Sequence, residues 1–140
     1  MSLDPQPLAP ALEAAKASGW TAVLLDLDGV QTKAELMRRV DAALRLPEWF
    51  GGNWDALADC LRDLSWLPDA GRLVAVTSWR GYADARPADW ETFSEILEEA
   101  VEFWRAEEDA PPFAVLLAES GPGPAAGAPP QPPRLKRRRG

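Results

Sequence analysis

Apolar residues along the chain fall into two kinds of segment, continuous runs and helically spaced sets. The continuous runs have the length of β-strands and fit strands that helices cover on both faces. They span residues 21–27, 73–77 and 113–118. Apolar spacings of three and four predict helices over residues 33–44, 54–64 and 89–105, and a shorter helix over residues 11–18. This alternation predicts an α/β fold, a small three-stranded parallel sheet packed with helices.

The chain is expected to form one domain with an extension at each end. Residues 1–19 are predicted to be a partly mobile extension, since three prolines lie within the first ten positions. Residues 20–119 form the domain, and residues 79–87 within it are expected to be irregular. Residues 120–140 are rich in Gly, Pro and Ala and poor in large apolar residues, which predicts a disordered tail with a basic end.

Charge divides the chain into an acidic body and a basic end. The whole sequence carries −7, but five of its fifteen Lys and Arg residues lie in the last seven positions, so residues 1–133 carry −12. An acidic body repels nucleic acid and suits a basic protein partner. No apolar run approaches the length of a membrane span, and the first residues do not resemble a secretory signal. We therefore expect a cytoplasmic protein without a membrane partner.

The composition excludes several kinds of catalytic site. The sequence contains no histidine, so a Ser/His/Asp or Cys/His device is excluded. Cys60 is the only cysteine, which leaves no metal-spaced Cys/His set and no internal disulfide. A buried, reduced thiol is the interpretation that its place beside an apolar helix face favours. We expect no catalytic residues, no metal site and no cofactor.

The most informative stretch is a stiff loop that leads into an acidic helix. Pro47 fixes its own φ, and Gly51-Gly52 permits a sharp turn. Asn53 then provides a side-chain oxygen that can cap the first turn of the helix. Trp49 lies in this loop beside the acidic helix, and an aromatic next to fixed charges is typical of a protein-binding surface. The alternative is a loop aromatic that covers the edge of the core.

The helix after this loop has an apolar face and an acidic one. Its large apolar residues, Trp54, Leu57, Leu61 and Leu64, recur at i, i+3, i+7 and i+10. Asp55, Asp59 and Arg62 fall nearly opposite them, at i, i+4 and i+7. The acids could form a solvated face, or they could bind a basic partner.

A second acidic motif ends the first predicted strand. Residues 24–30 resemble the Asp-x-Asp-Gly motif of haloacid-dehalogenase-type phosphatases. That resemblance would make Asp26 a nucleophile and Asp28 a general acid/base, with Mg²⁺ between them. The other residues that this family needs do not follow in the expected strand-end context. A turn that ends the strand is the alternative, since Asp-Gly pairs are common in turns.

The basic residues at the end of the tail give a third possibility. Residues 134–139 could contact nucleic acid or an acidic surface, which would make the chain an interaction module. The alternatives are a disordered solubility tail and a tether that folds back on the acidic body.

Residues 46–61 resemble the signature of the barstar family, intracellular inhibitors of secreted microbial ribonucleases of the barnase type. The order is a Pro-Glu-aromatic-aromatic-Gly loop, then Asn-x-Asp-Ala-Leu-x-Asp-Cys-Leu without a gap. A weaker resemblance extends over roughly residues 20–118, with the family's element order. It implies a barstar-like fold and a non-enzymatic inhibitor of immunity or antitoxin type. It also implies a one-to-one complex with a basic ribonuclease.

The same resemblance assigns roles to individual residues. It places Asp59 where a substrate phosphate would bind, and Asp55 as the second acid at the basic rim. Trp49 would lie on the nuclease's catalytic histidine, with Phe50 beside it. A family glutamate on the last helix aligns best with Glu99, although Glu98 or Glu102 could serve. The expected partner-binding set is Trp49, Phe50, Asn53, Asp55, Ala58, Asp59, Arg62 and Glu99.

This set departs from the family prototype at Trp49-Phe50, which lacks the phenolic hydroxyls of a tyrosine pair, and at two positions of the helix. Ala58 stands where the prototype has a tryptophan, and Arg62 where it has a small hydroxyl residue. An arginine at the rim should repel a basic enzyme unless it turns back to Asp59 or Asp63. The partner could therefore be a divergent ribonuclease or another basic nuclease.

Overall fold

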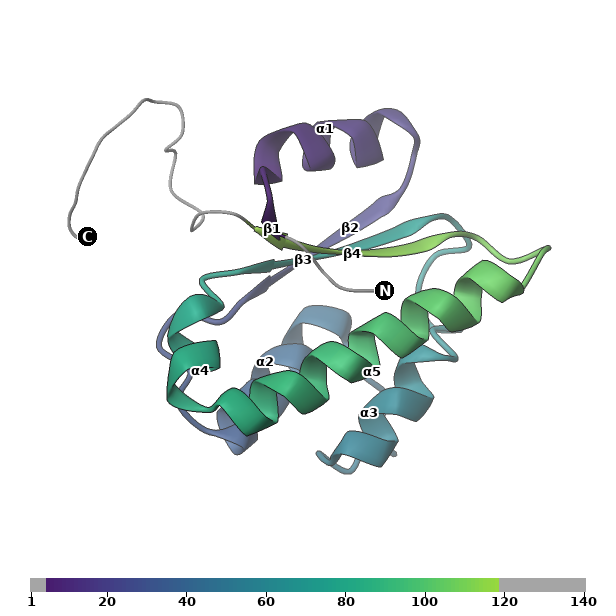
Figure 1. The fold of residues 1–140 in the computed structure, drawn as a ribbon. Coiled ribbons are helices and arrows are strands. Elements are labelled where there is room, and N and C mark those ends of the chain that lie inside the picture. Colours follow the sequence, from purple (N-terminus) through teal and green to yellow (C-terminus); the bar gives the residue numbers. More distant parts are fainter. Residues whose placement is uncertain (1–4, 119–140) are drawn as a thin grey trace.

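The computed structural model describes residues 5–118, which form a four-stranded parallel sheet with helices on both sides (Figure 1). The strands lie in the order β1-β4-β3-β2. They are β1 (Pro5–Gln6), β2 (Thr21–Asp26), β3 (Arg72–Thr77) and β4 (Phe113–Ala118). The helices are α1 (Leu8–Ala17), α2 (Lys33–Leu44), α3 (Trp54–Leu61), α4 (Arg80–Ala85) and α5 (Pro87–Ala106).

The three predicted strands and the α/β class are confirmed, but the sheet has a fourth strand. β1 pairs in parallel with the end of β4, with Pro5 opposite Leu117 and Gln6 opposite Ala118. Two residues are too few to show a strand pattern. Proline is compatible with this place because an edge strand can do without one ladder N–H. The three-stranded expectation was therefore one short strand too few.

Helix α1 covers one face of the sheet and also begins earlier than predicted. It starts at Leu8 rather than Ala11, and Pro10 fits its first turn, where a missing N–H breaks no intrahelical bond. Ala15 packs with Leu73 and Ala75 of the central strand in a small apolar cluster. Regular structure thus starts at Pro5, inside the extension that was expected to be partly mobile.

The main core lies on the other face of the sheet, under α2, α3 and α5 (Figure 1). A side-chain cap starts α2: Glu35 N–H donates to Thr32 Oγ1 at 3.2 Å, and Glu35 Oε1 accepts a hydrogen bond at 3.3 Å from the N–H of Gln31, the residue before the cap. Val74 and Val76 of β3 face this core, and Phe93 of α5 is fully buried in it.

The two predicted apolar strands at the centre and edge of the sheet differ in burial. Every residue of β3 is buried, as its continuous apolar run predicts. β2 was expected to be covered on both faces, but it is an edge strand on which buried and more exposed residues alternate. Leu24 is 55% exposed. The burial of β2 is therefore lower than its apolar run predicted.

Residues 80–85 form helix α4, where an irregular segment was expected. This six-residue helix has no side-chain N-cap, and it is too short to show a periodic pattern. Its buried residue is Tyr82, and Arg86 N–H donates to Tyr82 O at 2.8 Å. Helix α5 begins at Pro87, a residue well suited to a first helical position, rather than at Asp89.

Two further features concern the ends of elements and of the chain. Helix α3 ends at Leu61, three residues before the predicted Leu64, which has a φ of 55°. The tail over residues 120–140, with its basic end, lies outside the described residues. Within residues 5–118, no helix has both the length and the apolar character needed to cross a membrane.

Candidate functional site

The loop before α3 displays one aromatic side chain and buries most of another. Phe50 N–H donates to Pro47 O at 3.0 Å, which closes a turn, and Gly52 adopts a φ of 74° that favours glycine. Trp49, at the tip of this turn, is 56% exposed, whereas Phe50 is half-buried and packs against the main core. The loop therefore presents Trp49 to solvent from an anchored base.

The predicted cap starts helix α3. Asn53 Oδ1 accepts a hydrogen bond from Ala56 N–H at 2.8 Å. Leu57, Cys60 and Leu61 on the inner face are at most 1% exposed. This face holds α3 against the core, as the apolar spacing predicted.

Two contacts fix α3 against α5. The rings of Trp54 and Phe93 lie 6.5 Å apart near the start of α3. At its end, Trp104 Nε1–H donates to Leu61 O at 2.7 Å, so the indole satisfies a carbonyl that the helix itself leaves free. The two helices therefore run side by side in the same sense (Figure 1).

The outer face of α3 carries the predicted acids. Asp55 and Asp59 are both exposed. Asp59 Oδ1 accepts a hydrogen bond from Arg62 Nη2 at 3.2 Å, and the side chains of this pair are 65% and 47% exposed respectively. Ala58 lies beside them but is half-buried and packs against the core. The face thus combines two accessible carboxylates with one accessible guanidinium.

The candidate glutamates lie on α5, next to α3. Glu99 is exposed and Glu98 is half-buried. Glu102 is exposed and accepts a hydrogen bond from Arg105 Nη1 at 2.8 Å. Glu98 and Glu99 have no such bond within residues 5–118, and Glu99 is the more exposed of these two.

The single cysteine lies beneath this face and is inert. Cys60 is fully buried and not disulfide-bonded, as expected. Burial, and then the negative charges of Asp59 and Asp63, raise the pKa of its thiol to about 11. The thiol is therefore protonated at neutral pH and serves as a small apolar group in the core.

The phosphatase-like motif lies at the other end of the domain, at the carboxyl ends of the strands. Asp26 Oδ1 accepts hydrogen bonds from Thr77 Oγ1 at 3.1 Å and from Asp28 N–H at 3.2 Å. Arg39 donates to Asp26 O at 2.6 Å and to Asp28 O at 2.9 Å. These bonds tie β2 to β3 and α2, which supports the interpretation of the motif as a structural turn.

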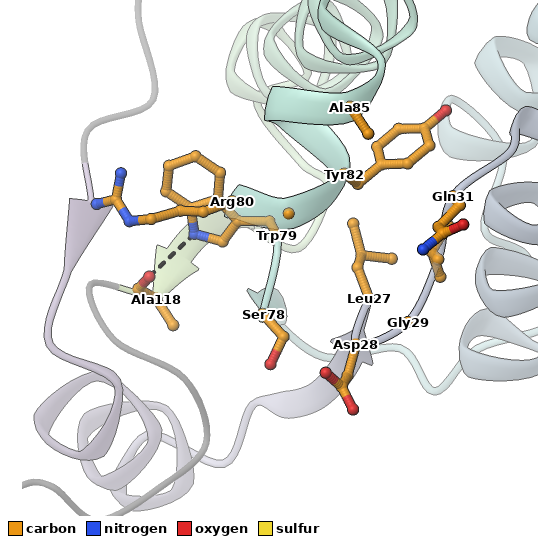
Figure 2. Close-up of a pocket in the computed structure, with 12 residues that line it drawn as sticks. Leu27, Asp28, Gly29, Gln31, Ser78, Trp79, Arg80, Tyr82, Ala85 and Ala118 are labelled. Carbon is orange, nitrogen blue, oxygen red and sulfur yellow. Dashed lines mark hydrogen bonds between the residues drawn. The ribbon is translucent and has the colours of Figure 1, made fainter. Parts of the chain in front are cut away.

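A pocket of about 430 Å³ lies beside this turn (Figure 2). Asp28 and Gln31 line it from the end of β2, and Ser78, Arg80 and Tyr82 line it from the β3–α4 segment. Figure 2 shows the Asp28 carboxylate and the Ser78 hydroxyl pointing away from the centre of this group. Within residues 5–118, no three His, Cys, Asp or Glu residues are grouped so that they could hold a metal ion.

Two contacts at the site were not predictable from local patterns. Lys33 Nζ lies 5.4 Å from the centre of the Trp54 ring, which joins the first turns of α2 and α3. The Trp104 bond to Leu61 joins residues 43 positions apart. Such partners become neighbours through the fold, and no spacing rule relates them.

Comparison with the models of known protein families gives a match. The model of a family described as Barstar (barnase inhibitor) matches residues 20–118, which include the loop, α3 and the glutamates of α5. No curated protein matches the sequence.

Proposed function

Because the chain belongs to the family described as Barstar (barnase inhibitor), we propose that it inhibits a basic ribonuclease by occluding the active site. The proposed contact surface is the loop and outer face of α3, with Trp49, Asp55 and Asp59 at its centre. In this proposal Asp59 takes the place of a substrate phosphate and Asp55 contacts the basic rim. Trp49 covers an active-site side chain, and Glu99 contributes from α5.

The observation that carries the proposal is that one side of α3 is buried and the other exposes two carboxylates. Leu57, Cys60 and Leu61 lock one side of the helix into the core, while Asp55 and Asp59 are exposed on the other side. Carboxylates on a fixed support bind without a large cost of ordering, which favours affinity. A stiff anionic helix is therefore a suitable mimic of a phosphate chain.

The charge of the domain supports the same partner. Residues 5–118 contain twenty Asp and Glu residues and ten Lys and Arg residues, a balance of −10. A ribonuclease must be cationic where phosphate binds, so opposite fields would accelerate the encounter. The association rate should accordingly fall as ionic strength rises.

The biological setting follows from what such a complex would achieve. A cell that makes a secreted ribonuclease needs protection from any enzyme that folds before export. We propose that this chain acts in the cytoplasm as the immunity or antitoxin partner, in a one-to-one complex.

The test is calorimetric titration of the full chain into a purified barnase-type ribonuclease, with RNA cleavage assayed in parallel. We expect one-to-one binding that abolishes cleavage and that weakens when a mononucleotide occupies the enzyme's active site. Absence of binding to ribonucleases of this type would contradict the proposal. Binding that leaves cleavage intact would contradict occlusion.

A further inference from the structure

We infer that Arg62 selects the partner, and that the nuclease carries a carboxylate beside its phosphate-binding cations, placed to receive this guanidinium. This inference rests on the proposed function and adds a specificity rule to it. It concerns the part of the proposed surface that a purely acidic mimic of RNA would not contain.

Arg62 belongs to the same stripe of side chains as the two acids. Asp55, Asp59 and Arg62 follow one another at spacings of four and three residues, so they lie on one face of the helix. Helix α5 has the same spacing at Glu95, Glu99 and Glu102, where all three residues are acidic. The stripe on α3 therefore changes sign directly after its second acid, whereas the stripe on α5 carries three acids before Arg105, which pairs with Glu102 at the end of that helix.

The ion pair in the free protein leaves Arg62 available. Its Nη2 lies 3.2 Å from Asp59 Oδ1, but about half of its side chain and two thirds of that of Asp59 are exposed. Exposed pairs of this kind are weak, because water screens them and ordering two flexible side chains costs entropy. A fixed cation in a desolvated nuclease site can therefore displace Arg62 from Asp59.

Displacement creates a new requirement at the interface. Arg62 is the C-cap residue of α3, so its backbone stays within one turn of Asp59 when its side chain moves. Its guanidinium then faces the cations that bind phosphate, and a cation next to cations that lacks an acceptor disfavours binding. A carboxylate on the nuclease offsets this repulsion and supplies the missing acceptor. A nuclease without such a carboxylate therefore binds more weakly.

The direction in which one substitution changes the affinity tests this inference. Arg62→Ala makes the surface more acidic, so simple attraction to a basic enzyme predicts tighter binding. Our inference predicts the opposite: dissociation of the complex becomes about tenfold faster or more, and Arg62→Glu weakens affinity about a hundredfold. Lys16→Ala is the matched control, because it removes the same charge from exposed α1 across the sheet. It should change affinity less than about twofold.

The experiment uses surface plasmon resonance with the full chain and the barnase-type ribonuclease that the wild-type chain inhibits. Alanine substitution of each carboxylate at the edge of the enzyme's active site, combined with Arg62→Ala, locates the acceptor. One carboxylate should account for most of the loss, so that the double variant is no weaker than either single variant. Unchanged thermal unfolding midpoints would show that the Arg62 variants are folded.

The outcomes separate this inference from the proposed function. If Asp59→Ala weakens binding while Arg62→Ala tightens it or leaves it unchanged, the inference is overturned and the inhibitor proposal stands. If Arg62→Ala weakens binding but couples to no carboxylate of the enzyme, the specificity rule is also wrong. If neither the wild-type chain nor its variants bind such a ribonuclease, both proposals fail.

Discussion

Two pairs of aspartates in this protein have different surroundings, although both pairs stand out in the sequence. Asp26 and Asp28 end β2, where the Asp26 carboxylate accepts hydrogen bonds from Thr77 and from a backbone N–H. Asp55 and Asp59 lie on the outer face of α3, where the partner of Asp59 is the exposed Arg62. All four residues are exposed, but the carboxylate of Asp26 links elements of the fold, whereas that of Asp59 is bound only by the exposed Arg62 and remains accessible to another molecule.

The difference shows that a motif is informative only together with its supports. The strand-end pair matches a short catalytic pattern, but Thr77 donates to the Asp26 carboxylate and Arg39 donates to the backbone carbonyls of Asp26 and Asp28. These bonds join elements of the domain. The helical pair matches no catalytic pattern. The Asn53 cap, the buried face of α3 and the hydrogen bond from Trp104 to Leu61 O together hold these carboxylates in place.

Asp59→Ala should remove the largest single contribution to binding. Truncating one partner of a desolvated charge pair costs about 2–5 kcal/mol, so we expect affinity for the ribonuclease to fall at least about thirtyfold. Calorimetric titration measures the loss. Asp84→Ala, which removes an exposed carboxylate of α4, is the control and should change affinity little. Equal losses for the two variants would contradict the proposed site.

Raising the pH should lower the free energy of unfolding, and the first contribution to this loss should come from Cys60, beneath the acidic face. The pKa of buried Cys60 is raised from 9.0 to about 11, so the folded state holds a proton that the unfolded state releases. The free energy of unfolding should fall between about pH 9 and pH 11, by up to about 2–3 kcal/mol. Urea unfolding at successive pH values measures it.

A second buried group, Tyr82 beside the strand-end turn, loses its proton at a higher pH than Cys60. Burial, then Asp89, raise the pKa of Tyr82 from 10.0 to about 12, so its contribution is lost from about pH 10 upward. Cys60→Ala should therefore remove the decline between about pH 9 and pH 10, reduce it between about pH 10 and pH 11, and leave the part above about pH 11, which Tyr82 causes. A Cys60→Ala variant whose decline is identical to that of the wild type would contradict the assignment.

Trp49→Ala should weaken binding without weakening the fold. The side chain is 56% exposed, so its removal costs little folding energy, whereas an aromatic anchor at an interface contributes about 1–2 kcal/mol or more. We expect affinity to fall about tenfold and the thermal midpoint to stay unchanged. Phe50→Ala is the informative contrast, because that half-buried ring packs against the core and its loss should lower the midpoint.

Asp26→Ala should have the smallest effect, and on stability alone. It removes the acceptor for Thr77 and for the Asp28 N–H, which should cost about 1 kcal/mol in chemical denaturation. Affinity for the ribonuclease should stay within about twofold. Phosphatase activity toward an aryl phosphate in the wild-type chain that this substitution abolishes would revive the alternative that Asp26 is a nucleophile.

Much of the fold was predictable because its main elements have strong local signals. The apolar runs located β2, β3 and β4, and Asn53 and Thr32 capped the predicted helices. The signals failed where tertiary packing decides. β1 is two residues long, α4 is six, and Leu24 is exposed because β2 lies at the edge of the sheet.

The candidate site was predictable to the level of which residues face outward. The spacing placed Asp55, Asp59 and Arg62 on one exposed face, and the structure agrees. It could not place Trp104 against Leu61, because these residues belong to different helices. Nor could it separate the two aspartate pairs, since the role of Asp26 depends on Thr77, 51 residues away.

Hydrogen–deuterium exchange of the full chain, with and without a barnase-type ribonuclease, tests the proposed surface most directly. It compares the two aspartate regions in one experiment and requires no substitution. We predict that the ribonuclease slows amide exchange over residues 48–62 and leaves residues 26–31 and 78–85 unchanged. Slowed exchange confined to residues 26–31 and 78–85 would contradict the proposed binding surface and would place the partner at the carboxyl edge of the sheet.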